Sequence, residues 1–193
     1  MSPTIYLVTG ANRGLGRGLT AALLQRPNTA VIAAVRDPTH TSATSLDSLP
    51  AASGSKAIVI KIDSASETDP STAMAELQSA HSISHLDVVI ANAGISSYYG
   101  PLVSTPVAEF VDHWRVNTLG PVLLFQAAWP LLEKSAAPQF VVVSTGVASI
   151  GDMASLPPIP ASAYASSKAA VNWLTRKMHF EHERLVAFPI SPG

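Results

Sequence analysis

Six short runs of almost purely apolar residues alternate along this chain with segments of helical spacing. The runs, rich in valine and isoleucine, span 5–8, 30–35, 57–62, 86–91, 140–144 and 185–190. Continuous apolar runs are typical of strands in a parallel sheet that is covered on both faces. The helix-like segments span 14–25, 42–49, 68–79, 107–117, 118–134 and 163–184, and residues 95–106 and 146–162 are interpreted as irregular loops. The alternation predicts an α/β fold, a doubly wound parallel sheet of six strands.

Composition narrows the class of protein further. The chain has 193 residues, of which 47% are hydrophobic and 13% charged, so we expect a single domain, 1–193, with a sizeable core. The net charge of −1 and the absence of cysteine argue against a nucleic-acid partner, disulfides and thiolate zinc sites, and no metal site is expected. No signal-peptide pattern begins the chain, and the apolar stretch 121–132 is too short to span a bilayer. We therefore expect a cytoplasmic protein without a membrane partner.

A glycine-rich turn connects the first strand to the first helix. Gly10, Gly14 and Gly16 stand in the spacing G-x-x-x-G-x-G, which permits a tight turn, a close backbone approach and close packing of the helix. The helix that follows offers free N–H groups and a positive dipole end to a phosphate. The turn therefore predicts a site for a dinucleotide pyrophosphate, with Leu15 beside it. A glycine turn without a ligand is the alternative interpretation.

Tyr164 and Lys168 lie four residues apart and so share one face of the last predicted helix. An adjacent ammonium stabilises a phenolate. Lowering a tyrosine pKa from about 10 to about 7 takes roughly 4 kcal/mol. By itself the pair is more typical of a solvated helix surface, so its interpretation as an acid–base pair depends on the rest of the chain.

The ordered motifs together resemble the short-chain dehydrogenase/reductase family. Besides the glycine turn and the Tyr164/Lys168 pair, the matching segments are Asn92-Ala93-Gly94, Asn117-Thr118-Leu119-Gly120, Ser144-Thr145 and Ser191-Pro192-Gly193. The resemblance implies a Rossmann-type NAD(P)-binding domain and an oxidoreductase that reduces a carbonyl to an alcohol, or the reverse. Residues 117–121 and 140–146 look most like fungal ketoreductases of polyketide pathways. A small aromatic or polyketide carbonyl substrate and a role in secondary metabolism would follow.

By this resemblance, Tyr164 is the general acid or base, Lys168 lowers its pKa and binds the nicotinamide ribose, and Asn117 holds a relay water. The hydroxyl that polarises the substrate carbonyl is Thr145 or Ser144, and the alignment leaves both open. The cofactor-binding residues implied are Gly10, Asn12, Arg13, Gly14, Leu15, Gly16, Arg36, Asp63, Asn92, Ala93 and Gly94, with Tyr164 and Lys168. Asp63 would meet the adenine.

The end of the second strand bears on the choice of cofactor. Arg36 follows the strand directly, and Arg13 lies in the glycine turn. Two guanidiniums suit a ribose 2′-phosphate, which favours NADPH over NADH. Asp37 would favour NAD if its carboxylate, rather than Arg36, faced the ribose 2′-hydroxyl.

The chain departs from the resembled family in length. Family members run to about 250 residues, in the ordinary range of a domain. Here the chain stops just after the sixth strand, so we expect the last family strand and the substrate lid to be missing. The alternatives are then a nucleotide-binding pseudoenzyme without turnover or an oligomerisation partner. As in family members, a homodimer or tetramer would use helices 118–134 and 163–184. Tyr98, Tyr99 and Phe110 either line a pocket for an aromatic ketone or simply cover the loop.

Overall fold

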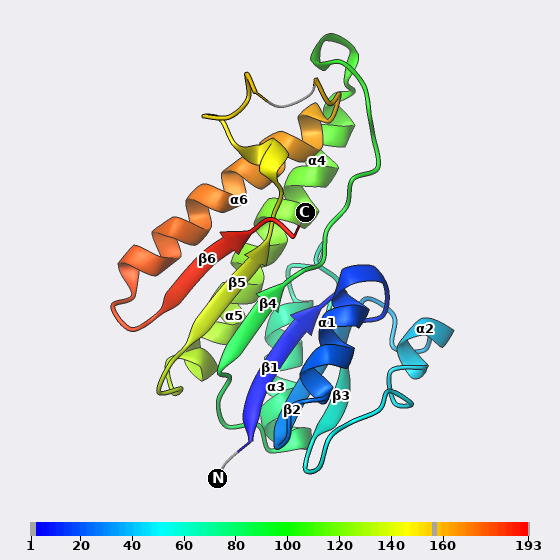
Figure 1. The fold of residues 1–193 in the computed structure, drawn as a ribbon, viewed down its shortest axis with the longest axis vertical. Coiled ribbons are helices and arrows are strands. Elements are labelled where there is room, and N and C mark those ends of the chain that lie inside the picture. Colours follow the sequence, from blue (N-terminus) through cyan, green and yellow to red (C-terminus); the bar gives the residue numbers. More distant parts are fainter. Residues whose placement is uncertain (1–2, 156–157, 193) are drawn as a thin grey trace.

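The computed structural model describes residues 3–155 and 158–192 and confirms the doubly wound parallel sheet (Figure 1). Its strands are β1 (Thr4–Thr9), β2 (Thr29–Val35), β3 (Lys56–Lys61), β4 (Val88–Ala91), β5 (Gln139–Val143) and β6 (Val186–Ile190). All are parallel, in the order β3-β2-β1-β4-β5-β6. The order reverses between β1 and β4. Open α/β sheets bind ligands beyond the carboxyl ends of the strands at such a switch point.

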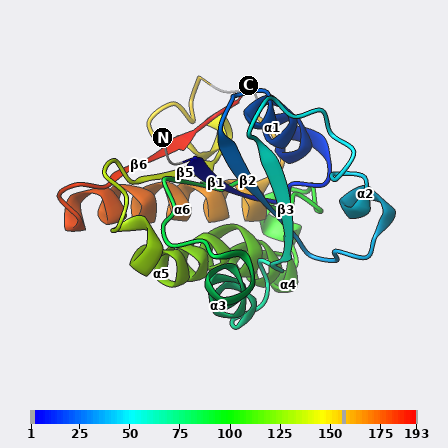
Figure 2. The same ribbon diagram turned by 90° about the horizontal axis from the view of Figure 1, so that it is seen from below.

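Helices cover both faces of the sheet, as the apolar runs predict. Figure 2 shows α1 (Gly14–Leu24) on one side and α3 (Asp69–His81), α5 (Gly120–Leu132) and α6 (Ser162–Glu181) on the other. Neighbouring residues of β1 therefore enter different cores. Leu7 packs in the cluster of α3, α5 and α6, whereas Val8 packs in the cluster of α1. No helix of the described residues is long and apolar enough to cross a membrane.

Two predicted helices are shorter than expected. The segment 42–49 forms only α2 (Thr41–Thr44), because the hydroxyls of Thr44, Ser45 and Ser48 donate to carbonyls three residues back and compete with helical bonds. The last helix ends at Glu181 rather than at residue 184. His182 is extended there, with φ −130°.

The helices predicted over 107–117 and 118–134 form one continuous structure. It consists of α4 (Val107–Trp114), the π-helical turn η2 (Arg115–Leu119) and α5. Pro121 has no N–H, so it cannot donate the α-helical hydrogen bond to the Asn117 carbonyl. The π-helical turn η2 thus falls where the sequence predicts a boundary between two helices. There Asn117 lies outside the regular α-helical hydrogen-bond pattern.

Two loops rise beyond the carboxyl end of the sheet, one after β4 and one after β5 (Figure 1). In the described residues both predicted loops are loops, and each holds one short 3-10 turn: η1 (Leu102–Ser104) and η3 (Gly146–Ala148). The loops meet where Gly100 and Ala161 form a parallel bridge and the Gly100 N–H donates to the Pro160 carbonyl over 2.8 Å. Pro157 and Gly193, which belong to the predicted loop and terminal turn, lie outside the described residues.

Candidate active site

An open cleft of about 580 Å³ lies at the switch point of the sheet. Every residue proposed from the sequence for the nucleotide alone lines it: Gly10, Asn12, Arg13, Gly14, Leu15, Gly16, Arg36, Asp63, Asn92, Ala93 and Gly94. Asp37, His40, Ser42, Ile62, Ser64 and Ile95 complete the lining. The fold thus brings segments from four strand ends to one cleft.

The glycine turn is built by backbone conformation and close packing. Gly10 and Gly14 have positive φ, 64° and 50°. A Cβ on Gly16 would overlap the Gly10 carbonyl oxygen, so no side chain fits there. Asn92 Nδ2 donates to the Thr9 carbonyl over 2.8 Å, and the buried Thr9 hydroxyl accepts from the backbone N–H of Asn92. Asn92 therefore braces the turn as well as lining the cleft. Thr9, which directly precedes Gly10, is a further residue of the site that the sequence motifs do not single out.

The cleft is lined by two arginine side chains and by a carboxylate that is already hydrogen-bonded within the chain. Within the described chain, the guanidiniums of Arg13 and Arg36 make no hydrogen bond or ion pair, and both line the cleft. The Asp37 carboxylate instead accepts from the Thr39 hydroxyl at 2.7 Å and the Thr39 N–H at 2.9 Å. These bonds hold the pKa of Asp37 below its ordinary value. Of the two ionic groups at the strand tip, Arg36 is the one left for a ligand.

A short polar chain, missed by sequence reasoning, borders the same cleft. Ser42 Oγ accepts from Asn12 Nδ2 over 2.7 Å and lies 2.8 Å from His40 Nδ1. The Ser42 backbone N–H also donates to that nitrogen. Since a backbone N–H can only donate, Nδ1 of His40 is an acceptor and its proton lies on Nε2.

Tyr164 and Lys168 lie in the first two turns of α6 and are not among the residues that line the cleft. Lys168 Nζ approaches the cleft at Gly94, where a Cβ would lie 3.4 Å from it. Lys168 is only 3% exposed, and its Nζ donates to the Val143 carbonyl over 2.8 Å. Burial lowers the pKa of Lys168 to about 8. The pKa of the Tyr164 phenol is raised, first by burial and then by Tyr99, while a hydrogen bond to Thr145 lowers it. The expected lowering of the Tyr164 pKa is therefore wrong for this chain's own residues, because desolvation of the phenolate outweighs the hydrogen bond.

The two candidate hydroxyls after β5 differ in surroundings. Thr145 lies close enough to Tyr164 to lower its pKa, and its hydroxyl accepts from the Val147 N–H over 3.3 Å. Ser144 is 6% exposed, and its Oγ has no hydrogen-bond partner in the described part of the chain. The structure thus brings Thr145, and not Ser144, to the phenol.

Asn117 is completely buried, with its side-chain amide fully engaged. Oδ1 accepts from the Ile95 N–H at 2.8 Å, and Nδ2 donates to the Ile95 carbonyl at 2.9 Å and to Ser167 Oγ at 3.0 Å. A Cβ on Gly94 would lie 3.0 Å from this Oδ1 and 3.4 Å from Lys168 Nζ. Asn117, Gly94 and Lys168 therefore meet at one point. Ser167, unremarked in the sequence, joins the π turn to α6.

The tyrosines of the loop after β4 have separate positions. A Cβ on Gly100 would lie only 2.6 Å from the Tyr98 hydroxyl, so Tyr98 packs over the loop itself. Tyr99 is 62% exposed, and its hydroxyl lies 2.9 Å from Ser96 Oγ. Only Tyr99 is near enough to Tyr164 to influence its pKa.

The sequence profile described as short chain dehydrogenase matches residues 4–188. The chain belongs to the short-chain dehydrogenase family. This membership makes it an oxidoreductase by family and confirms the resemblance drawn from the ordered motifs. Within the described residues of this family member, no three histidine, aspartate or glutamate side chains gather where they could hold a metal ion.

Fungal relatives in the short-chain dehydrogenase family are similar over nearly the whole chain. Norsolorinic acid ketoreductase nor1 of Dothistroma septosporum is 47% identical over 98% of this chain and 71% of its own length. Norsolorinic acid ketoreductase stcE of Emericella nidulans is 46% identical over 98% and 72%. The chain thus spans just over 70% of the length of these relatives.

Solved structures have the same fold. The NADPH-bound carbonyl reductase from chicken fatty liver superposes with a TM-score of 0.87 at 28% identity, over 100% of this chain and 77% of that one. The putative carbonyl reductase Sniffer of Caenorhabditis elegans gives 0.86 at 29% identity, over 100% and 85%.

Proposed function

We propose that this protein is an NADPH-dependent carbonyl reductase that converts a ketone to an alcohol, or the reverse, with Tyr164 as the proton donor or acceptor. The observation that carries the proposal is that Tyr164, next to Thr145 and one turn from buried Lys168, lies near a cleft whose two guanidiniums have no partner among the described residues. The ketoreductase names of the relatives and the NADPH-bound reductase of similar fold support it. Residues 1–193 would act as one NAD(P)-binding domain in the cytoplasm.

The residues of the cleft fit an NADP-type dinucleotide. The side-chain-free surface at Gly16 and the positive-φ turn at Gly10 and Gly14 suit a pyrophosphate at the start of α1. Arg13 and Arg36 suit the 2′-phosphate, since Asp37 is occupied by Thr39. When bound, the nicotinamide supplies or accepts the hydride.

The proton-handling residues have distinct roles in this proposal. Because its pKa is raised, Tyr164 is neutral near pH 7 and holds a proton on Oη to give to the carbonyl oxygen. The Thr145 hydroxyl donates a hydrogen bond to the same oxygen. Lys168, one turn along α6 from Tyr164, supplies a buried cation. Asn117 holds a relay water by its backbone carbonyl, since its amide is engaged and Pro121 cannot donate to that carbonyl.

The substrate proposed is an aromatic or polyketide carbonyl compound. Several large apolar side chains stand exposed on the two loops beside Tyr164: Tyr99, Leu102, Val103, Ile150, Met153 and Ile159. Exposed apolar side chains gathered at one rim mark binding surfaces. Two fungal relatives are named norsolorinic acid ketoreductases, which supports a ketone as the substrate.

The proposal is tested by titrating the purified protein with NADPH and NADH and then assaying a panel of aryl ketones. We expect tighter binding of NADPH than of NADH and NADPH-dependent turnover. Arg36→Ala should weaken NADPH binding by about tenfold or more, the loss of one charge-assisted contact, while NADH binding changes little. Binding without turnover of any ketone would instead support the pseudoenzyme, and equal effects of Arg36→Ala on both nucleotides would rule out the assigned 2′-phosphate contact.

A further inference from the structure

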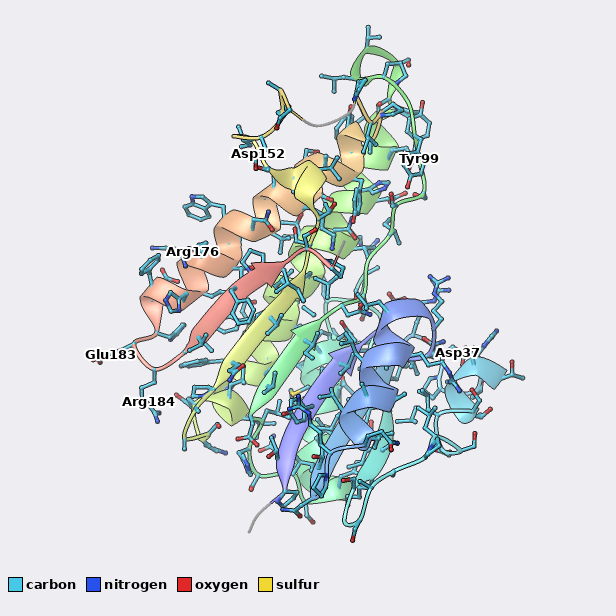
Figure 3. The ribbon with its side chains drawn as sticks, in the orientation of Figure 1. Asp37, Tyr99, Asp152, Arg176, Glu183 and Arg184 are labelled. Carbon is cyan, nitrogen blue, oxygen red and sulfur yellow. The ribbon has the colours of Figure 1, made fainter. Side chains whose placement is uncertain are left out.

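The hydroxyls of Ser96 and Tyr99 form a polar pair beside the proton donor. The Gly100–Pro160 hydrogen bond and the Gly100–Ala161 bridge connect this stretch to the two residues that directly precede α6. Tyr164 lies in the first turn of that helix. Figure 3 shows Tyr99 on the loop after β4, near the amino-terminal end of α6. The electrostatic effect of Tyr99 on Tyr164 agrees with this placement.

The loop that carries the pair is anchored from several elements. Both backbone groups of Ile95 bond the Asn117 amide at 2.8 and 2.9 Å, the Ser97 N–H donates to His113 Nε2 at 3.3 Å, and Ser97 Oγ donates to Glu109 Oε2 at 3.3 Å. With the Gly100 bridge, anchors stand on both sides of Ser96 and Tyr99. A pre-positioned polar group contributes more to recognition than a mobile one, because less freedom is lost on binding.

The pair has unused hydrogen-bonding capacity. Ser96 Oγ and Tyr99 Oη lie 2.9 Å apart, so one proton is shared between them and one O–H donor remains, together with acceptor lone pairs. Neither hydroxyl has another partner among the described residues, and both side chains are exposed. The two loops also expose apolar side chains, such as Leu102 and Ile150. The pair can form hydrogen bonds that these apolar side chains cannot.

We propose that the Ser96–Tyr99 hydroxyl pair determines substrate specificity by binding a second oxygen of the substrate, a hydroxyl or carbonyl on the ring system that bears the reacting ketone. The inference rests on the proposed function and deepens it. Either form of oxygen is accommodated, because the pair can both donate and accept. Unsubstituted aryl ketones would be reduced less well, since they leave the pair unsatisfied when they cover it.

The test compares acetophenone with its 2′-, 3′- and 4′-hydroxy derivatives. For the parent protein, at least one hydroxy isomer should exceed acetophenone in kcat/KM by roughly three- to tenfold, the value of one hydrogen bond. Tyr99→Phe and Ser96→Ala should reduce this ratio to about one. Tyr98→Phe, which removes the neighbouring phenol that packs on Gly100, should keep it. A ratio that is the same in the parent and in Tyr99→Phe would overturn the proposal.

A binding measurement separates this inference from the proposed function. The same ketones are titrated into the protein in the presence of NADP, with tryptophan fluorescence as the readout. If no ketone turns over, the proposed reductase activity fails, yet the ratio of dissociation constants still decides the role of the pair. We expect the favoured hydroxy isomer to bind the parent more tightly than acetophenone and to lose that advantage in Tyr99→Phe; equal affinities in the parent would refute the inference.

Discussion

At the scale of single residues, burial shifts the two central groups in opposite directions. It raises the pKa of the Tyr164 phenol and lowers that of the Lys168 ammonium to about 8. Both shifts favour the neutral form of the group. At pH 7 the phenol still carries its proton and most of the lysine is still charged, so a donor and a cation coexist near the cleft.

The buried lysine has a cost to stability that depends on pH. Its folded-state pKa of about 8 is below the unfolded value of 10.5, so between these values the unfolded state binds more protons and stability rises with pH. The full shift corresponds to about 3 kcal/mol. We expect the stability of the parent relative to Lys168→Met to rise by up to this amount from pH 8 to 10.5, measured by urea unfolding. If the difference in the free energy of unfolding between the parent and Lys168→Met did not change with pH, the pKa of Lys168 would not be lowered in the folded protein.

The two hydroxyls after β5 give a matched pair of variants. Thr145→Val removes the hydroxyl next to Tyr164 and should lower kcat/KM by about 10²- to 10³-fold, the effect of losing one donor to a developing oxyanion. Ser144→Ala removes a buried hydroxyl that has no hydrogen-bond partner among the described residues, so activity should change less than about twofold and stability should hold or rise. Steady-state kinetics and thermal unfolding of both variants measure this. The opposite order of effects would assign the catalytic hydroxyl to Ser144.

At the scale of elements, the start of α1 requires a residue without a side chain at Gly16 but not at Gly18. The turn brings the Gly10 carbonyl against Gly16, while nothing lies within 4 Å of a Cβ built on Gly18. Gly16 therefore fixes the distance between the helix and the turn, whereas Gly18 only leaves the helix backbone more flexible in the unfolded chain.

Alanine at these two positions should have opposite effects. Gly16→Ala must push the helix away from the turn, at a cost of about 1–3 kcal/mol or more, and should weaken NADPH binding. Gly18→Ala should stabilise the protein by about 0.5–1 kcal/mol, the difference in helix propensity. Chemical denaturation and nucleotide titration of both variants check this, and a harmless Gly16→Ala would contradict the packing of the turn.

The sequence predicted the elements well because their signals are local. A continuous apolar run such as 30–35 indicates a buried strand. The glycine spacing that begins at Gly10 and the spacing of four between Tyr164 and Lys168 can be read directly from the sequence. Side-chain direction was less accessible, since a shift of one residue changes the face of a strand. The sequence alone therefore does not decide between Ser144 and Thr145. The engagement of the Asn117 amide by Ile95 depends on segments far apart in the chain, which no local pattern reveals.

At the scale of the whole molecule, the apolar residues left at the surface are unevenly distributed. The apolar stretch 121–132, which lies within α5, is mostly core, since Leu124, Leu131 and Leu132 are buried. Helix α6 instead exposes Trp173 and Phe180, with the Arg176 guanidinium 4.7 Å from the Phe180 ring. Figure 3 shows Arg176 on the outer side of this helix. Large exposed aromatic side chains near arginine are typical of protein interfaces.

The proposed contact through α6 predicts a homodimer or tetramer in solution. Trp173 is 66% exposed, and burying it against a second copy would contribute about 2 kcal/mol or more per subunit. Light scattering after size exclusion should therefore give at least twice the chain mass. Trp173→Glu should shift the protein towards the monomer by placing a charge in the contact, whereas Val107→Glu, at the exposed start of α4, should leave the mass unchanged. A monomeric parent, or equal masses for the parent and Trp173→Glu, would exclude α6 as the contact between copies.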